Sequence, residues 1–335
     1  MISRSKVLVT GADGFIGSHV VEALVEAGAD VRAFCLYNSW GFRGWIDRLS
    51  ERTLKSIEVV SGDLRDMTSV GEAVAGCDLV LHLGALIAIP HSYKAPDAYV
   101  AVNITGTLNV LQSALKSGSR VVCTSTSEVY GTAKTELISE SHPLNAQSPY
   151  AATKIAADQL ALSFHRSFGL PVSVLRPFNT YGPRQSMRAI IPATIMQLAR
   201  GNRRLQLGAL DPTRDFTFVE DTAKGFLQIA ACDSADGQVF NIGSGFEISI
   251  GETVGEICEI FGVSVDIEQD VARLRPKESE VYRLIADCSK ARSAFGWAPV
   301  YGGGLPGFRR GLQRTVDWFR EPANLEFYKQ QGYVV

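Results

Sequence analysis

Short apolar runs alternate with longer amphipathic segments along the first half of the chain. The apolar runs are rich in β-branched residues and lie at 6–10, 30–36, 57–61, 78–83, 121–123 and 172–176. Between them, apolar residues recur at helical spacing, as in Val20, Val21 and Leu24, and again within 98–117 and 150–168. Buried strands that alternate with helices through short connections predict an α/β fold, a doubly wound parallel sheet with helices on both faces.

The alternation becomes less regular after residue 176. The pattern there predicts a helix at about 190–200, a strand followed by a helix start within 214–221, and another strand just before Asn241. It then predicts a helix at 251–261, a strand at 263–268 and a final helix that ends near Trp318. We therefore expect a smaller C-terminal α/β lobe that is partly interleaved with the first domain.

The glycines of the first turn predict the ligand of the larger domain. Gly11-Ala-Asp-Gly14-Phe15-Ile16-Gly17 follows the first strand directly and opens the first helix. In this context the glycines allow a tight turn and close approach of the backbone, and the helix N-terminus offers free N–H groups to a pyrophosphate. A tight turn without a ligand is the less favoured interpretation. The pattern indicates a Rossmann-type domain that binds a nicotinamide dinucleotide.

Other positions at strand ends are expected to contact the same cofactor. The second strand ends Leu36-Tyr37-Asn38, without the acid that holds a ribose 2′-hydroxyl and without an adjacent arginine for a 2′-phosphate, so NAD and NADP remain open. Asp63 is a candidate adenine contact, although it also suits a helix cap. The full set of expected cofactor contacts is Gly11, Gly14, Phe15, Ile16, Gly17, Asp63, Leu64, Leu83, Gly84, Ala85, Tyr150 and Lys154.

The strand at 121–123 and the helix that begins near Tyr150 carry the candidate catalytic groups. Thr126, Ser127 and Glu128 follow the strand end, and Lys154 lies four residues after Tyr150, on the same face of the helix. A hydroxyl, a carboxylate, a phenol and an ammonium group would then meet in one pocket, and each has a use in proton transfer. Taken singly, these residues also suit a packed tyrosine, a helix cap and ordinary turn positions.

Composition and charge exclude several classes of function. The chain has 335 residues, 46% of them hydrophobic and 20% charged, with a net charge of −2. Nothing predicts a nucleic-acid surface, a membrane span or a signal peptide. The six cysteines have no CxxC spacing and the histidines no metal-ligand spacing, so we expect a cytoplasmic protein without a metal site.

Several longer motifs together resemble a known enzyme family. GADGFIG, YAATK, RPFNTYGPRQ and RDFTFVEDTA resemble the extended short-chain dehydrogenase/reductases that act on nucleotide sugars. LYNSWGF, HLGALIAIPHSY, LDPTRDFTFV and RPKESEV are most similar to the N-acetylhexosamine 4,6-dehydratases of legionaminic acid-type pathways. The resemblance implies that residues 1–178 plus about 215–244 bind the dinucleotide, and that about 179–214 and 245–335 bind the nucleotide sugar. It implies a UDP- or GDP-linked N-acetylglucosamine as substrate and does not fix the nucleotide.

The resemblance also implies roles for individual residues. Tyr150 would take the proton of the sugar 4-hydroxyl with Thr126 sharing that hydrogen bond, and Lys154 would favour the phenolate and hold the nicotinamide ribose. Glu128 would remove the proton from carbon 5, and either Glu128 or Ser127, through water, would protonate the leaving hydroxyl. The expected substrate contacts are Asn179, Ile190, Ile191, Gln206, Leu207, Arg214, Asn241 and Arg275. For the two arginines a structural ion pair is the alternative, and for the apolar residues it is core packing.

Other functions remain open on the same motifs. A UDP-glucuronate decarboxylase shares the Ser-Glu pair, but the sequence shows no obvious dedicated arginine for its carboxylate, and a 4-epimerase usually lacks the glutamate. A non-catalytic dinucleotide-sensing protein commonly loses Tyr150 or Lys154, and this chain has both. The resemblance also implies a homodimer that pairs the helices at about 98–117 and 150–168. The cofactor, NAD or NADP, would be held tightly and regenerated in each turnover.

Overall fold

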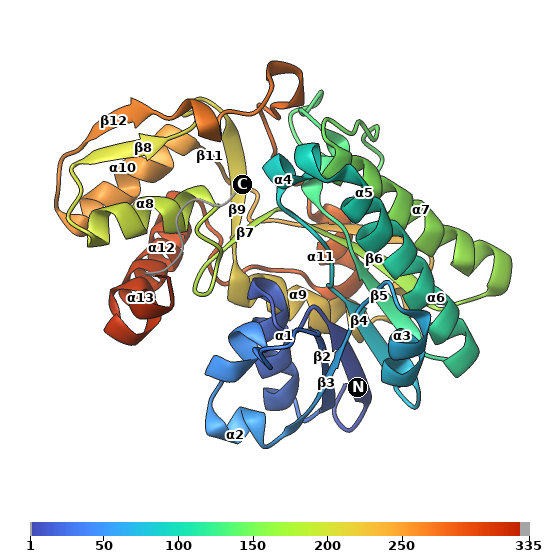
Figure 1. Cartoon of the computed structure of the whole chain (residues 1–335). Helices are drawn as coiled ribbons and strands as arrows, with labels where there is room; N and C mark the ends of the chain where they lie inside the picture. The colour runs from blue at the N-terminus through green and yellow to red at the C-terminus, as the bar shows by residue number, and fades with distance from the viewer. Residues whose placement is uncertain (1, 329–335) are drawn as a thin grey trace.

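A seven-stranded parallel sheet forms the centre of the larger part of the molecule (Figure 1). The computed structural model describes residues 2–328. The strand order is β10-β6-β5-β4-β1-β2-β3, and every neighbouring pair is parallel. The strands are β1 (Lys6–Thr10), β2 (Asp30–Leu36), β3 (Ile57–Gly62), β4 (Leu79–His82), β5 (Arg120–Thr124), β6 (Val172–Pro177) and β10 (Val239–Ile242). The prediction of a doubly wound α/β fold is confirmed.

Helices cover both faces of this sheet because its strands are apolar on both sides. One face packs against α1 (Phe15–Glu26), α9 (Val219–Ala230) and α11 (Ser289–Phe295). The other face packs against α3 (Met67–Val74), α6 (Gly106–Ser117) and α7 (Pro149–Phe168). The buried side chains form two separate apolar clusters, one on each face.

The segment predicted as one helix at 98–117 consists of three consecutive helical pieces. They are the end of α5 (Pro96–Tyr99), a π-helical stretch, Val100–Thr105, and α6, and a further short helix, α4 (Ile89–Lys94), precedes them. The next long helix has clear sequence signals at both ends. Ser148 caps α7 by accepting a hydrogen bond from the backbone N–H of Ala151, Pro149 occupies its first position, and Gly169 ends it with a left-handed φ of 70°.

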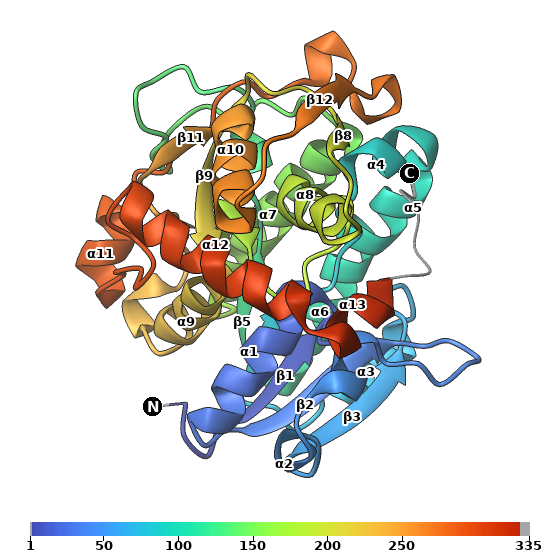
Figure 2. The ribbon, with the colours of Figure 1, turned by 90° about the vertical axis from the view of Figure 1, so that its left-hand side faces the viewer.

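The second part of the molecule is a smaller lobe with its own apolar core. Its helices are α8 (Ile190–Ala199), α10 (Ile250–Phe261), α12 (Leu305–Arg320) and α13 (Pro322–Tyr328). Its strands are β7 (Asn179–Tyr181), β8 (Arg204–Leu207), β9 (Thr213–Phe218), β11 (Glu247–Ser249) and β12 (Asp266–Gln269). Figure 2 shows α12 running across this lobe, in front of β9.

The chain crosses between the two parts several times. It leaves the large sheet after β6, and returns through α9, which packs beside α1, and through β10, which pairs with β6. The strand expected at 263–268 lies slightly later, at Asp266–Gln269, and pairs with β8. The last predicted helix continues to Arg320, two residues beyond Trp318. The division into a dinucleotide-binding domain and a sugar-binding lobe stays an interpretation of this arrangement.

A buried histidine couples the stability of the large sheet to pH. His82 is 3% exposed, and its Nδ1 lies 2.8 Å from Oγ1 of Thr10 while its Nε2 lies 3.0 Å from Oγ1 of Thr107. Because Thr107 already donates to the carbonyl of Asn103, Nε2 carries the hydrogen and Nδ1 accepts one. Burial lowers the pKa of His82 to about 3.

We expect the free energy of unfolding to fall as the pH decreases below about 6.5, the pKa of an unfolded histidine. Below that pH the unfolded chain binds a proton at residue 82 that the folded chain excludes, which costs up to about 1.4 kcal/mol per pH unit. Urea unfolding at several values between pH 7.5 and 5 measures this slope. His82→Asn should flatten the slope, and parallel curves for wild type and variant would contradict the assignment.

Candidate active site

A cavity of about 830 Å³ opens at the carboxyl ends of the large sheet, between the sheet and the smaller lobe. Both parts of the molecule contribute to its walls, as expected where strand ends and helix starts face a second lobe. All the expected cofactor contacts line it, as do all five expected catalytic residues. Of the expected substrate contacts, the cavity is lined by Asn179, Ile190, Ile191, Leu207, Arg214 and Arg275.

The glycine-rich turn forms one end of the cavity and leaves no room for side chains. Gly11 has a left-handed φ of +66°, and a Cβ added to Gly17 would come within 2.1 Å of the Gly11 carbonyl oxygen. A Cβ added to Gly11 would come within 2.7 Å of the Cα of Gly84, which lies two residues after β4. The first helix begins at Phe15 without a side-chain cap, so its free N–H groups stay available to a ligand. The residues present fit a bound dinucleotide.

Asp63 lies in the wall of the cavity but does not cap the following helix. Its carboxylate is held by Arg65, whose Nε lies 3.0 Å from both oxygens, and this bond lowers the pKa of Asp63. Asp66 is the residue that caps α3, through hydrogen bonds from the backbone of Thr68 and Ser69. The interpretation of Asp63 as a cap is therefore wrong, and its contact with adenine stays a prediction.

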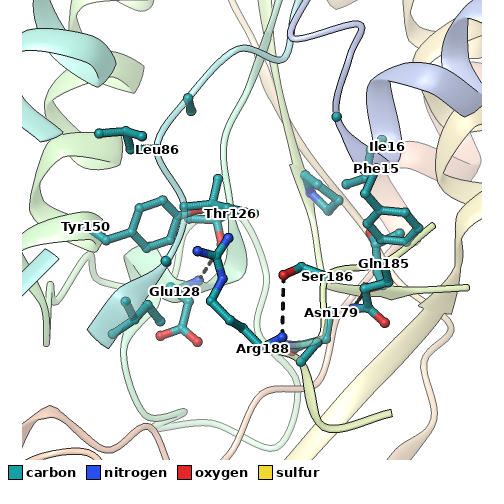
Figure 3. A pocket seen from close by; sticks show the side chains of 18 of the residues that line it. Phe15, Ile16, Leu86, Thr126, Glu128, Tyr150, Asn179, Gln185, Ser186 and Arg188 are labelled. Carbon is teal, nitrogen blue, oxygen red and sulfur yellow. Dashed lines mark hydrogen bonds between the residues drawn. The ribbon is translucent and has the colours of Figure 1, made fainter. Parts of the chain in front are cut away.

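Tyr150 and Lys154 point into the cavity from the first turns of α7 (Figure 3 shows Tyr150). Burial raises the pKa of the Tyr150 phenol, and a hydrogen bond with the side chain of Thr126 opposes that rise. Burial lowers the pKa of Lys154, and the nearby carboxylate of Asp158 opposes that fall. The Lys154 ammonium donates to the carbonyl of Thr124, at the end of β5.

Glu128 lies beside this pair on a short 3-10 helix, Ser127–Tyr130, that directly follows β5. It is 7% exposed, so it is not a surface cap. The cap is Thr126, whose Oγ1 accepts a hydrogen bond from the Glu128 N–H at 3.3 Å. One carboxylate oxygen of Glu128 lies 3.5 Å from Nη1 of Arg275.

Two arginines and a second glutamate line the cavity next to Glu128. Arg214 is 5% exposed, and burial lowers its pKa. Its Nη2 lies 3.4 Å from Glu280, while Nη1 of Arg275 lies 3.9 Å from the same carboxylate oxygen. Oδ1 of Asn179, in the same cavity wall, is buried without a hydrogen-bond partner among the described residues. Buried polar groups are normally paired, so this oxygen is available to a polar ligand in the cavity.

Two expected substrate contacts lie outside the cavity lining. Gln206 alternates with Leu205 and Leu207 on β8, and its amide donates to Glu268 of the neighbouring strand at 2.7 Å. Asn241 is part of β10 in the large sheet, and its side chain is fully buried. Its Oδ1 accepts from the Tyr130 hydroxyl at 2.7 Å and its Nδ2 donates to a backbone carbonyl at 2.9 Å. The structure thus gives both residues structural roles, and the prediction of a substrate contact is corrected for both.

The comparisons with known proteins identify the family of the chain. The family model described as GDP-mannose 4,6 dehydratase matches residues 8–303. The chain belongs to this family.

Relatives within the family perform different reactions. The chain is 33% identical to a dTDP-glucose 4,6-dehydratase from Streptomyces antibioticus, over 94% of this chain and 92% of the relative. It is 30% identical to a UDP-N-acetyl-alpha-D-glucosaminuronate decarboxylase from Bacillus cytotoxicus, over 96% and 99%. A dTDP-glucose 4,6-dehydratase structure from Streptomyces venezuelae, with NAD and DAU bound, superposes with a TM-score of 0.82 at 30% identity, covering 95% of this chain and 98% of that one.

The family assignment establishes the general class of the chain. It is an extended short-chain dehydrogenase/reductase of the nucleotide-sugar dehydratase, epimerase and decarboxylase group. Within residues 2–328, no helix is long and apolar enough to cross a membrane. The same residues contain no cluster of histidine, cysteine or acidic side chains that could hold a metal ion.

Five charged residues of the cavity were not expected from the sequence: Asp13, Arg65, Arg273, Glu280 and Arg188. Among them, we single out Arg188. It lies between β7 and α8, and Figure 3 shows its side chain extending toward Thr126 and Glu128. Burial raises the pKa of Tyr99, and the charge of Arg188 opposes that rise. Among the described residues it has no ion pair or side-chain hydrogen bond. Ile190 and Ile191, close to Arg188 in the sequence, were expected to contact the substrate. Hydrophobic periodicity, however, does not predict the direction of an arginine side chain in the connection between a strand and a helix.

Proposed function

We propose that the chain is a nucleotide-sugar 4,6-dehydratase that converts UDP- or GDP-linked N-acetylglucosamine into its 4-keto-6-deoxy derivative. The observation that carries this proposal is the buried carboxylate of Glu128 beside the Tyr150–Thr126 pair. Tyr150 and Thr126 suffice for oxidation and reduction at carbon 4. Removal of a proton from carbon 5 needs a further base, and Glu128 is the group available for it.

A bound nicotinamide dinucleotide would accept a hydride from carbon 4 and return it to carbon 6. Tyr150 would take the proton of the 4-hydroxyl, with Thr126 sharing the hydrogen bond. Because burial raises the pKa of Tyr150, the phenolate needs a nearby positive charge, and Lys154 supplies one from the next turn of the helix. The resulting ketone acidifies carbon 5, and Glu128 would remove that proton. The carbon 6 hydroxyl would leave as water with a proton from Glu128 or one relayed by Ser127 through water, and carbon 5 would take up a proton as the hydride returns to carbon 6.

The smaller lobe would bind the nucleotide and its diphosphate. Arg214 and Arg275 present guanidinium groups suited to phosphate oxygens, and the orphan Oδ1 of Asn179 can accept from a sugar hydroxyl. Ile190, Ile191 and Leu207 would form an apolar wall for the base.

A second candidate is a nucleotide-uronate decarboxylase, and Arg188 favours it. The sequence shows no arginine dedicated to a sugar carboxylate, whereas Arg188 brings to the same cavity a guanidinium that has no ion pair within residues 2–328. A simple 4-epimerase explains neither Glu128 nor Arg188. A dinucleotide-sensing protein does not need the complete set of Tyr150, Lys154, Thr126 and Glu128.

The proposal is tested by incubating the protein separately with UDP-N-acetylglucosamine, GDP-N-acetylglucosamine and the corresponding UDP-linked uronate. Mass spectrometry should find loss of one water from one of the first two, with no net consumption of cofactor. Loss of carbon dioxide from the uronate alone would replace the dehydratase with the decarboxylase. Cofactor released on denaturation of the purified protein distinguishes NAD from NADP.

A cytoplasmic homodimer remains part of the proposal. Of the apolar residues on the expected dimer helices, Tyr99, Leu111, Leu162 and Phe164 are buried in the chain's own core. A dimer would therefore use the partly exposed Val102, Leu108 and Leu160 of this helix pair. Light scattering of the purified protein measures the mass in solution.

A further inference from the structure

Three segments that carry the polar groups of the cavity meet at one side chain, that of Gln147. Its Oε1 accepts a hydrogen bond from the backbone N–H of Thr132 at 2.6 Å. Its Nε2 donates to the backbone carbonyls of Glu280 at 2.8 Å and Glu278 at 3.2 Å. Gln147 itself precedes Ser148, the cap of the helix that carries Tyr150. We call this set of bonds the Gln147 clamp.

The clamp joins the three groups of active-site residues. Thr132 lies just after the 3-10 helix that carries Glu128, and Glu280 belongs to the segment that also carries Arg275. In Figure 1 the latter segment crosses the top of the molecule between β12 and α4. Arg275 and Glu128 approach each other to 3.5 Å across this junction.

Side-chain bonds determine where the segment 275–280 lies. Its only regular structure is a single 3-10 turn, Lys277–Ser279, so no helix or sheet ladder anchors it. Besides the two bonds from Gln147, the hydroxyl of Ser279 donates to the carbonyl of Gln147 and contacts the Tyr93 hydroxyl. Loss of these bonds would leave the backbone that carries Arg275 less firmly held, although its ion pairs with Glu128 and Glu280 remain.

The chain opposite Gln147 is shaped to admit it. Gly131 has a φ of +64°, and a Cβ at this position would lie 2.5 Å from Oε1 of Gln147. A side chain at residue 131 would therefore displace the amide, and only glycine adopts this backbone without strain. The lack of a side chain at Gly131 therefore makes room for the Gln147 amide where the three segments meet.

We propose that Gln147 is a positioning residue that fixes Arg275 and Glu280 relative to Glu128 and Tyr150. The inference rests on the proposed binding of a nucleotide sugar in this cavity. Gln147 does not line the cavity, so it acts through the segments that it holds. Its loss should weaken binding of the nucleoside diphosphate and misplace the sugar, while the glycine-rich turn keeps its cofactor.

The variant Gln147→Glu tests this inference with almost no change of shape. Glutamate keeps the acceptor for Thr132, but as a carboxylate it cannot donate to the carbonyls of Glu278 and Glu280. At pH 8 we expect kcat/KM for the nucleotide sugar to fall about 10- to 100-fold. Binding of UDP or GDP, measured by calorimetry, should weaken in parallel, with the Tm and the retained cofactor changed little. At lower pH the protonated acid can donate again, so affinity should recover in the variant and not in wild type.

Gln238→Glu is the matched control. The amide of Gln238 also donates to a backbone carbonyl, that of Ser234 at 2.7 Å, and it lies outside the cavity lining. This variant should leave UDP and GDP affinity within about twofold of wild type. Equal losses in both variants, or wild-type affinity in Gln147→Glu at pH 8, would overturn the inference. Failure of the proposed function would appear separately, as a wild-type protein that converts no nucleotide sugar.

Discussion

Replacing Tyr150 with phenylalanine is expected to lower kcat by about 10²- to 10⁴-fold. The substitution removes only the hydroxyl that would take the proton of the sugar 4-hydroxyl. The ring stays packed against Tyr99, with centroids 6.4 Å apart, so the fold should be retained. Product formation followed by mass spectrometry and cofactor content of the purified variant are the two measurements.

Tyr282→Phe provides the control for this change. It removes the same atom from a tyrosine that is 51% exposed and does not line the cavity. Its kcat should equal that of wild type. If Tyr150→Phe keeps kcat within about threefold of wild type, Tyr150 does not transfer the proton in the rate-determining reaction.

Replacing Glu128 with glutamine is expected to separate oxidation from elimination. Tyr150 and Thr126 remain intact, so carbon 4 can still be oxidised, whereas the amide cannot remove the proton from carbon 5. After quenching, mass spectrometry should find a sugar nucleotide that has lost two hydrogens but no water, at no more than one equivalent per site. Overall kcat should fall by about 10²- to 10⁴-fold.

Glu278→Gln is the control on the neighbouring loop, because Glu278 is exposed and lies outside the cavity lining. Normal water loss in Glu128→Gln would exclude Glu128 as the base.

The sequence was sufficient to predict features that depend on neighbours along the chain. The first strand, the glycine turn and the helix start are contiguous, and their order fixes where a dinucleotide lies. Tyr150 and Lys154 are one helical turn apart, so their common face follows from the spacing alone. These local rules explain why every expected cofactor and catalytic residue lines the same cavity.

Features that depend on distant segments were predicted less well. Gln206 and Leu207 are adjacent in a strand, so their side chains point to opposite sides, and period-two alternation already excluded placing both in one pocket. Asn241 was expected just after a strand but lies within β10, and its amide oxygen accepts a hydrogen bond from the buried Tyr130 hydroxyl. Arg188 and Gln147 lie in connections, whose course is set by contacts far along the chain.

The central claim is that one hydrogen moves within the substrate from carbon 4 to carbon 6 as water leaves. The most direct test uses the nucleotide-linked N-acetylglucosamine that shows water loss, with deuterium at carbon 4. We expect a 4-keto-6-deoxy product that keeps the deuterium at carbon 6. Deuterium retained at carbon 4 of an epimerised sugar, or lost to solvent, would contradict it.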